Sequence, residues 1–135
     1  MIIAVDFDGI LTTDAGCFPR IGPPNDGMIG LMKELIADGH EVILWTCRVD
    51  KPLQEAVTWC AERGINFCAV NDNAPSNKAK YMKEYPNGTR KVYADIYIDD
   101  HNLEYIESVS KFCEGYAQMN TIKILRRITK CHEES

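Results

Sequence analysis

The chain of 135 residues lacks the features that mark several large classes of protein. Its six cysteines form no CxxC pair and show no zinc-ligand spacing, and four of them lie within apolar segments, which indicates reduced, packed thiols in a cytoplasmic protein. No apolar run approaches the ~20 residues that span a bilayer, and no basic segment precedes the first apolar run, so neither a membrane helix nor a secretory signal is expected. The net charge of −5 disfavours nucleic acid as a general partner, because such binding depends on a basic surface.

What the chain does contain is an ordinary globular composition, with 45% hydrophobic and 26% charged residues. It shows no repeat, low-complexity tract or linker, so residues 1–135 are expected to form a single domain. Apolar periodicity and turn residues predict strands that alternate with helices. The predicted strands cover residues 2–7, 41–46, 65–70 and 92–98. The predicted helices cover about 24–38, 52–63, 78–84 and 103 onward, with a break near 120–121, where Thr121 is expected to cap a final helix.

This alternation predicts an α/β fold with a mostly parallel sheet, arranged as a three-layer, Rossmann-like α/β/α domain. Parallel strands share one carboxyl edge, and ligands in such sheets bind just outside that edge. Polar residues close each predicted strand, and we expect them to face one crevice. They are Asp6 and Asp8 after the first strand, Thr46 after the second, Asn71 to Asn73 after the third, and Asp99 with Asp100 after the fourth.

Four carboxylates with no nearby histidine or thiolate cluster favour a hard cation, Mg²⁺ before Ca²⁺ or Zn²⁺. Mg²⁺ held by a few carboxylates usually meets a phosphate, and Thr46 is placed to donate its hydroxyl to a phosphoryl oxygen. Gly9 lets the backbone turn sharply and approach whatever the carboxylates hold. Because phosphoryl transfer depends on positioning and charge neutralisation, a lysine is also expected in the crevice.

Three strand-end motifs carry a resemblance to a known family. IIAVDFDGIL, EVILWT and DIYIDD, with an intervening lysine, resemble the haloacid dehalogenase superfamily of phosphotransferases in the same order. More narrowly, VDFDG, LWTCR and ADIYIDD look like its small capless, hydrolase-like members. The resemblance covers essentially the whole chain.

The resemblance implies a Mg²⁺-dependent phosphatase or phosphotransferase that works through an aspartyl-phosphate intermediate. Carried over by position, Asp6 would be the nucleophile and a metal ligand, and Asp8 the general acid and base and a second ligand. Thr46 would bind the phosphoryl group. Asp99 and Asp100 complete the metal set: Asp100 would be the direct or water-mediated ligand and Asp99 would orient the lysine, with direct contact of Asp99 with the metal as the alternative.

Further positions are assigned more broadly. The candidate substrate contacts are Gly9, Thr46, Cys47 and Arg48. The competing interpretations are a packed thiol for Cys47 and a solvated surface residue for Arg48. Lys78, Lys80 and Lys91 are the candidates for the active-site lysine. Lys78 is favoured because it begins a helix that leaves the active edge, whereas an extended strand would hold Lys91 about 26 Å from Asp99, at ~3.3 Å per residue. Ile10 departs from the motif, which usually has threonine after the glycine.

The spacing of the motifs leaves no room for a cap domain, and the loop over residues 12–26 is the only candidate flap. An open crevice suits a bulky phosphorylated substrate, or one enclosed by a second copy of the chain, and residues 113–128 carry enough apolar side chains for a dimer helix. The alternative function is a catalytically weak or inactive phosphate- or phosphoprotein-binding module on the same fold. A receiver-like signalling domain fits poorly, because the third strand closes with Val70-Asn71 rather than with an aspartate.

Overall fold

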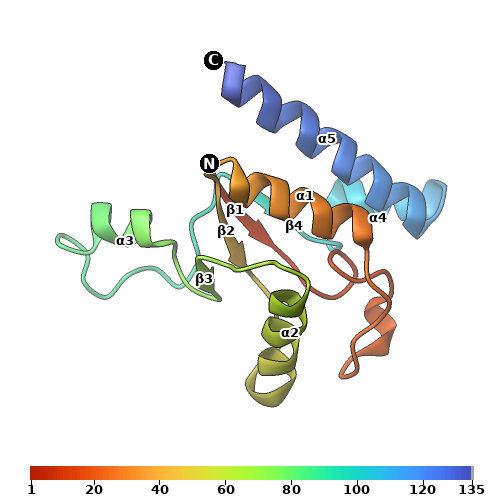
Figure 1. The fold of residues 1–135 in the computed structure, drawn as a ribbon, viewed down its shortest axis with the longest axis horizontal. Helices are drawn as coiled ribbons and strands as arrows, with labels where there is room; N and C mark the ends of the chain where they lie inside the picture. The colour runs from red at the N-terminus through yellow and green to blue at the C-terminus, as the bar shows by residue number, and fades with distance from the viewer. Residues whose placement is uncertain (135) are drawn as a thin grey trace.

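The protein folds around a small parallel sheet with helices before and after its strands (Figure 1). The structure is a computed structural model that describes the backbone of residues 1–134 and the side chains of residues 1–130. The strands are β1 (Ile2–Val5), β2 (Glu41–Leu44), β3 (Ala69–Val70) and β4 (Ile96–Ile98). The helices are η1 (Ala15–Cys17), α1 (Asp26–Ala37), α2 (Asp50–Glu62), α3 (Pro75–Tyr81), α4 (Leu103–Lys111) and α5 (Glu114–Glu134).

All four strands run parallel in the order β3-β2-β1-β4. Val5 pairs with Leu44 on one side and with Ile98 on the other, so the residues that follow β1, β2 and β4 emerge side by side. Backbone hydrogen bonds continue past the strands, from the amide of Asp6 to the carbonyl of Ile98 (2.9 Å) and from Trp45 to Val5 (2.9 Å). This register brings the functional motifs to one edge of the sheet.

The sheet is the middle of three layers. The side chains of Ile3, Val5 and Leu44 point to one face and belong to a large core that includes residues of α1, α2, α4 and α5. On the opposite face, a smaller cluster joins Ala4 and Ile43 to the chain on either side of α3, through Ala74, Val92 and Ala94. The α/β, Rossmann-like fold expected from the sequence is therefore confirmed, and no cap domain interrupts residues 1–134.

Helix boundaries follow local signals at the start of the chain and depart from them at the end. Asn25 caps α1 by accepting a hydrogen bond from the amide of Met28 (3.3 Å). The predicted break at 120–121 is wrong, since the chain turns at Phe112, between α4 and α5. Thr121 lies inside α5, where its hydroxyl donates to the carbonyl of Ala117 (2.9 Å) instead of capping a helix.

Three further elements depart from the prediction. The strand expected over 65–70 is strand only at Ala69–Val70, the helix expected over 78–84 lies at Pro75–Tyr81, and the strand expected over 92–98 is shortened. Residues 92–95 are not strand, and β4 begins only at Ile96. The Tyr97 hydroxyl donates to the carbonyl of Val92 (2.5 Å) and accepts from the amide of Ala94 (3.0 Å), so this segment folds back over the strand that follows it. None of the helices within the described part of the chain is both long and apolar enough to cross a membrane.

Candidate functional site

A cavity of about 530 Å³ opens at the carboxyl edge of β1, β2 and β4. Polar side chains from all three strand ends line it, together with two residues of the loop over 12–26. The lining comprises Asp6, Asp8, Ala15, Phe18, Trp45, Thr46, Cys47, Arg48, Asp99, Asp100 and His101. The predicted convergence of Asp6, Asp8, Thr46, Asp99 and Asp100 is thus present in the structure.

Asp6 carries the strongest electrostatic perturbation in this cavity. Burial, reinforced by the neighbouring charges of Asp99 and Asp100 and a hydrogen bond with Asp100, raises the pKa of Asp6 to about 8. Burial is also the main reason that the pKa of Asp100 is raised. One opposing contact orients the Asp6 carboxylate, because its Oδ1 accepts the amide hydrogen of Phe7 (2.8 Å). Carboxylates held this close repel each other unless a cation lies among them.

The donor chemistry fits a divalent cation. Asp99, Asp100 and His101 offer ligand atoms within 4.8 Å of one another, and Asp6 hydrogen-bonds to Asp100 beside them. Asp99 Oδ1 accepts the amide hydrogen of His101 (2.8 Å), so one oxygen of this carboxylate is already engaged. Asp6 and Asp100 are therefore the better placed pair to share one ion through oxygen ligands, as Mg²⁺ requires.

Gly9 allows Asp100 to approach the turn after β1. Its φ of +83° is a conformation that other residues adopt rarely, and a β-carbon at this position would overlap the Asp100 carboxylate. Two side chains hold the turn from behind, since the Tyr105 hydroxyl (3.1 Å) and Gln118 Nε2 (3.1 Å) both donate to the Gly9 carbonyl. Gly9 thus shapes the site through its backbone.

Arg48 is the principal correction to the predicted site. The side chain is only 1% exposed and forms a paired contact with Asp8, from Nε to Oδ2 (2.8 Å) and from Nη2 to Oδ1 (2.7 Å). The interpretation of Arg48 as a solvated surface residue is therefore wrong. Its remaining donors bind the carbonyls of Pro19 (3.0 Å), Arg20 (3.0 Å) and Pro52 (3.3 Å), so one guanidinium ties Asp8 to the candidate flap and to α2.

Thr46 has a hydroxyl that remains available for a ligand. Its Oγ1 accepts the amide hydrogen of Arg48 (3.1 Å), which leaves its own hydrogen free to be donated. Its amide donates to Oδ1 of Asn71 (2.8 Å), which anchors the strand end to the loop after β3. Cys47 beside it is exposed, so the packed-thiol interpretation is wrong, and its side chain lines the cavity.

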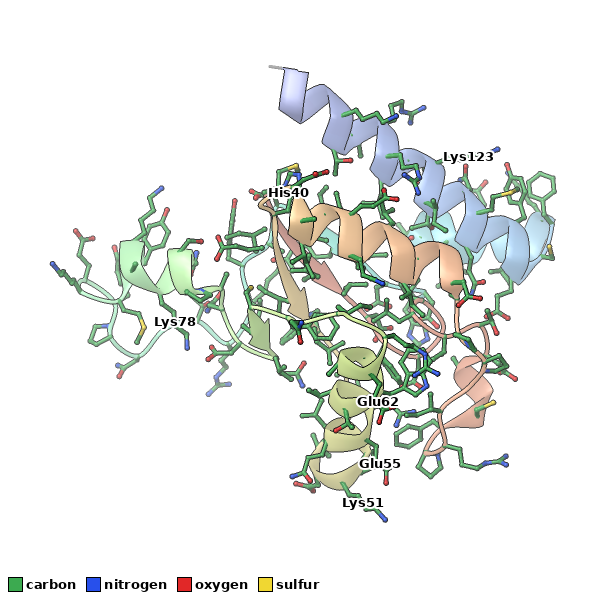
Figure 2. The ribbon with its side chains drawn as sticks, in the orientation of Figure 1. His40, Lys51, Glu55, Glu62, Lys78 and Lys123 are labelled. Carbon is green, nitrogen blue, oxygen red and sulfur yellow. The ribbon has the colours of Figure 1, made fainter. Side chains whose placement is uncertain are left out.

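The predicted lysine does not line this cavity. Lys78 forms an ion pair with Asp72 and lies on α3, well away from the strand ends of β1 and β4 (Figure 2). Lys80 lies over the ring of Tyr81, with Nζ 5.2 Å from the ring centroid. Lys91 Nζ is 5.3 Å from the centroid of the Tyr97 ring, because the chain folds back before β4. The extended-strand argument against Lys91 is therefore wrong.

Ile10, the departure from the family motif, has its side chain in the core rather than in the cavity. It is fully buried, and its carbonyl accepts a hydrogen bond from Asn25 Nδ2 (2.9 Å). A threonine two residues later does reach the turn, since Thr12 Oγ1 accepts the amide hydrogen of Gly9 (3.2 Å). The substitution at position 10 accordingly removes nothing from the cavity lining.

The sequence did not indicate the supporting roles of Tyr105 and Gln118 or the pairing of Arg48 with Asp8. Of the residues 71–73 expected to face the crevice, Asn71 supports the Thr46 amide instead, and Asp72 and Asn73 line a different cavity. Each of these contacts joins residues at least 25 positions apart in the sequence. From the sequence, Arg48 is only a candidate substrate contact. Of these contacts, the Arg48–Asp8 pair is the one that charge suggests. A buried arginine needs an acidic partner, since an unpaired buried charge is very costly.

Fold and site together define an α/β protein with a carboxylate cluster at the carboxyl edge of a parallel sheet. A conserved protein coded by a locus of Bacteroides thetaiotaomicron has a solved structure similar to this chain, with 34% sequence identity and a TM-score of 0.64. The match covers 82% of this chain and 89% of that one, and this chain belongs to the same family. No model of a protein family matches the sequence, and no curated protein matches it.

Proposed function

We propose that this protein is a Mg²⁺-dependent phosphomonoester hydrolase of the haloacid dehalogenase type that acts through an aspartyl phosphate on Asp6. The observation that carries the proposal is the convergence of Asp6, Asp8, Asp99 and Asp100 with Thr46 around one cavity. Neither packing nor solubility accounts for four carboxylates at this edge. The resemblance of the three strand-end motifs supplies the reaction type.

Asp6 is the nucleophile in the proposed reaction. Its Oδ1 is held by the Phe7 amide, which leaves the other oxygen to attack phosphorus. The bond between phosphorus and the alcohol oxygen breaks as the bond to Asp6 forms. Thr46 donates its hydroxyl hydrogen to a phosphoryl oxygen, and a bound Mg²⁺ would neutralise negative charge on the phosphate and on the carboxylates.

Asp8 moves protons in both halves of the reaction. It gives a proton to the departing alcohol oxygen and later takes one from the water that attacks phosphorus, which breaks the bond to Asp6 and releases phosphate. Both carboxylate oxygens of Asp8 accept from Arg48, so a proton must be carried at the second lone pair of one of these oxygens. Arg48 is therefore a positioning residue rather than a direct substrate contact.

Lys91 is the lysine that the geometry favours for this site, in place of Lys78. Tyr97 and Asp99 point to the same side of β4, because side chains alternate along a strand. Asp99 follows Ile98, and Asp6 follows its partner Val5, so the two acids are neighbours across the sheet. Lys91 lies over the ring of Tyr97, which precedes Asp99 by two positions in the sequence.

Replacement of the nucleophile tests the proposal. We expect Asp6→Asn to abolish Mg²⁺-dependent hydrolysis of p-nitrophenyl phosphate, whereas Asp38→Asn, an exposed acid at the end of α1, leaves it unchanged. Activity that survives in Asp6→Asn would sink the assigned nucleophile. Lys91→Ala should lower kcat strongly and Lys78→Ala should not.

A second candidate is a phosphate-binding module without turnover, and the Arg48–Asp8 pair favours it, because a carboxylate held at both oxygens is poorly placed to donate a proton. Phosphate binding in the presence of Mg²⁺, with no hydrolysis across a broad panel of phosphate esters, would identify this function.

We also propose a cytoplasmic location, supported by free thiols at all five cysteines whose side chains are described. A homo-oligomer that covers the open cavity remains part of the proposal.

A further inference from the structure

A second cavity lies outside the carboxylate site, on a projecting part of the molecule. Residues 75–93, which we call the arm, comprise α3 and the loop that leads back toward β4. Figure 1 shows this segment extending away from the remaining helices. Residues 79–91 are all exposed, so the arm has little packing of its own to explain its side chains.

The arm is basic in an acidic protein. It carries five cations (Lys78, Lys80, Lys83, Arg90, Lys91) against one carboxylate, Glu84, which gives a net charge of +4. Since the whole chain carries −5, the rest of the molecule carries −9. Lys78 is neutralised by Asp72, whereas Lys80, Lys83 and Arg90 form no ion pair with any residue that the structure describes.

The arm also encloses a cavity of about 520 Å³ with an aromatic lining, in which Lys78 is the one cation among the described residues, while Lys80, Lys83 and Arg90 are exposed at neighbouring positions of the arm. Tyr81, Tyr85 and Tyr93 line it and are 45%, 62% and 49% exposed. Asn77 and Thr89 add hydrogen-bonding groups to the same lining. Exposed rings flanked by cations are the arrangement on which successive bases of a single strand stack while its phosphates meet the positive charge.

The loop after β3 connects the two cavities, although none of their described lining residues is common to both. Asp72, in the lining of the arm cavity, directly follows Asn71, whose side chain accepts from the amide of Thr46 in the other lining. Trp45 also lines the carboxylate cavity and packs with the cluster that contains Ala74 and Val92 at the base of the arm. A chain lying on the arm therefore leads toward Thr46.

We propose that the arm binds single-stranded nucleic acid through stacking on its tyrosines and contacts of Lys80 and Lys83 with phosphates, which directs a terminal phosphate into the carboxylate cavity. The assignment of the terminal phosphate rests on the proposed hydrolase function, whereas binding by the arm does not. The acidic remainder of the chain repels a polyanion and so confines it to the arm. Binding of nucleic acid at the basic arm is therefore compatible with the net charge of −5, which disfavours such binding over the surface as a whole.

Binding is measured with a fluorescein-labelled decamer of thymidylate whose other end is a hydroxyl, so no hydrolysis can occur. We expect the anisotropy to saturate in low salt, and Tyr85→Ala to weaken binding at least about fivefold, the loss of one stacked base. The matched control is Phe112→Ala, which removes an aromatic ring of similar exposure, 64%, from the end of α4 and leaves affinity unchanged.

Charge is tested with two double variants that change the net charge equally. Lys80→Glu with Lys83→Glu should weaken binding and make the plot of log affinity against log salt shallower by at least about 1.4, from ~0.7 per phosphate contact. Lys51→Glu with Lys123→Glu, at sites remote from the arm in Figure 2, should leave both quantities close to wild type. Equal loss in both double variants would overturn the assignment to the arm.

Two further outcomes contradict the proposal: no anisotropy change with the wild-type protein, or arm variants that instead shift the sedimentation of the protein from dimer to monomer.

A hydrolysis assay separates this inference from the proposed function. With a phosphate at the free end of the decamer, binding without release of phosphate would overturn only the hydrolase assignment. Release of phosphate from a decamer and a mononucleotide at the same kcat/KM would overturn only the role of the arm.

Discussion

At the scale of single residues, the ion pair between Arg48 and Asp8 is the main interaction in the site. The guanidinium is buried, lies over the ring of Phe7 (4.9 Å to the centroid), and also holds the carbonyls of Pro19 and Arg20. A buried charge is tolerated when hydrogen bonds satisfy its donors, and removal of one partner leaves the other uncompensated. Arg48 consequently supports both the proton-transfer carboxylate and the loop beside it.

We expect Arg48→Ala to lower the free energy of unfolding by about 3–5 kcal/mol, because Asp8 and three carbonyls lose their partner. Urea denaturation monitored by circular dichroism measures the change. The exposed Arg127→Ala on α5 is the control and should stay within about 0.5 kcal/mol of wild type. A small effect at Arg48 would show that the pair contributes little to stability.

Asp6 makes the stability of the metal-free protein depend on pH. Its pKa is raised in the folded state, to about 8, so the folded protein retains a proton that the unfolded chain releases above about pH 4. Its contribution to stability is therefore complete below pH 4 and is lost as the pH rises through 8. In EDTA, the urea midpoint should fall between pH 5 and pH 8.5 by an amount that corresponds to a few kcal/mol.

The same measurement with Asp6→Asn should give a flatter profile, since asparagine does not titrate. Addition of Mg²⁺ to the wild-type protein should restore stability mainly at the alkaline end, where the carboxylates are charged and bind the ion. A wild-type midpoint that rises from pH 5 to pH 8.5 in EDTA would contradict the crowding of these carboxylates.

At the scale of elements, α4 and α5 support the turn that follows β1. Tyr105 comes from α4 and Gln118 from α5, and both donate to the carbonyl of Gly9. Burial, with a smaller effect from Glu114, raises the pKa of Tyr105 to about 12, so the phenol keeps its hydrogen for this bond at neutral pH. The helix pair thus fixes the backbone between Asp8 and the flap.

Tyr105→Phe removes one of these two hydrogen bonds without changing the packed ring. The expected loss of stability is about 1 kcal/mol, the usual net value of one hydrogen bond. Because the turn also positions Asp8, kcat should fall several-fold while KM stays constant. Steady-state kinetics against p-nitrophenyl phosphate provides the measurement, and a change confined to KM would contradict a positioning role.

The elements also show what local sequence can predict. Strong signals placed α1 to within about two residues, because Asn25 and Gly39 mark its two ends. The turn at Phe112 carries no glycine or proline, so the break between α4 and α5 had no local signal. Residues 92–95 fold back through hydrogen bonds of Val92 and Ala94 with the Tyr97 hydroxyl, which the alternating apolar pattern of this segment does not reveal.

At the scale of the whole molecule, parallel topology made the carboxylate cluster predictable. Once Asp6, Thr46 and Asp99 followed strands of one sheet, their meeting at one edge required no knowledge of side-chain packing. The positions of the candidate lysines were not predictable in this way, because they depend on how the long connection between β3 and β4 folds. Lys78 pairs with Asp72 in the structure, and Lys91 lies over the ring of Tyr97.

The most direct test of the central claim is chemical trapping of the intermediate on Asp6. The protein is mixed with Mg²⁺ and p-nitrophenyl phosphate, quenched during turnover and reduced with borohydride, which converts an aspartyl phosphate into homoserine. Peptide mass spectrometry should then find homoserine at position 6, and not in samples that lack Mg²⁺ or carry Asp6→Asn. Turnover without homoserine at position 6, or with homoserine at another aspartate, would contradict the account.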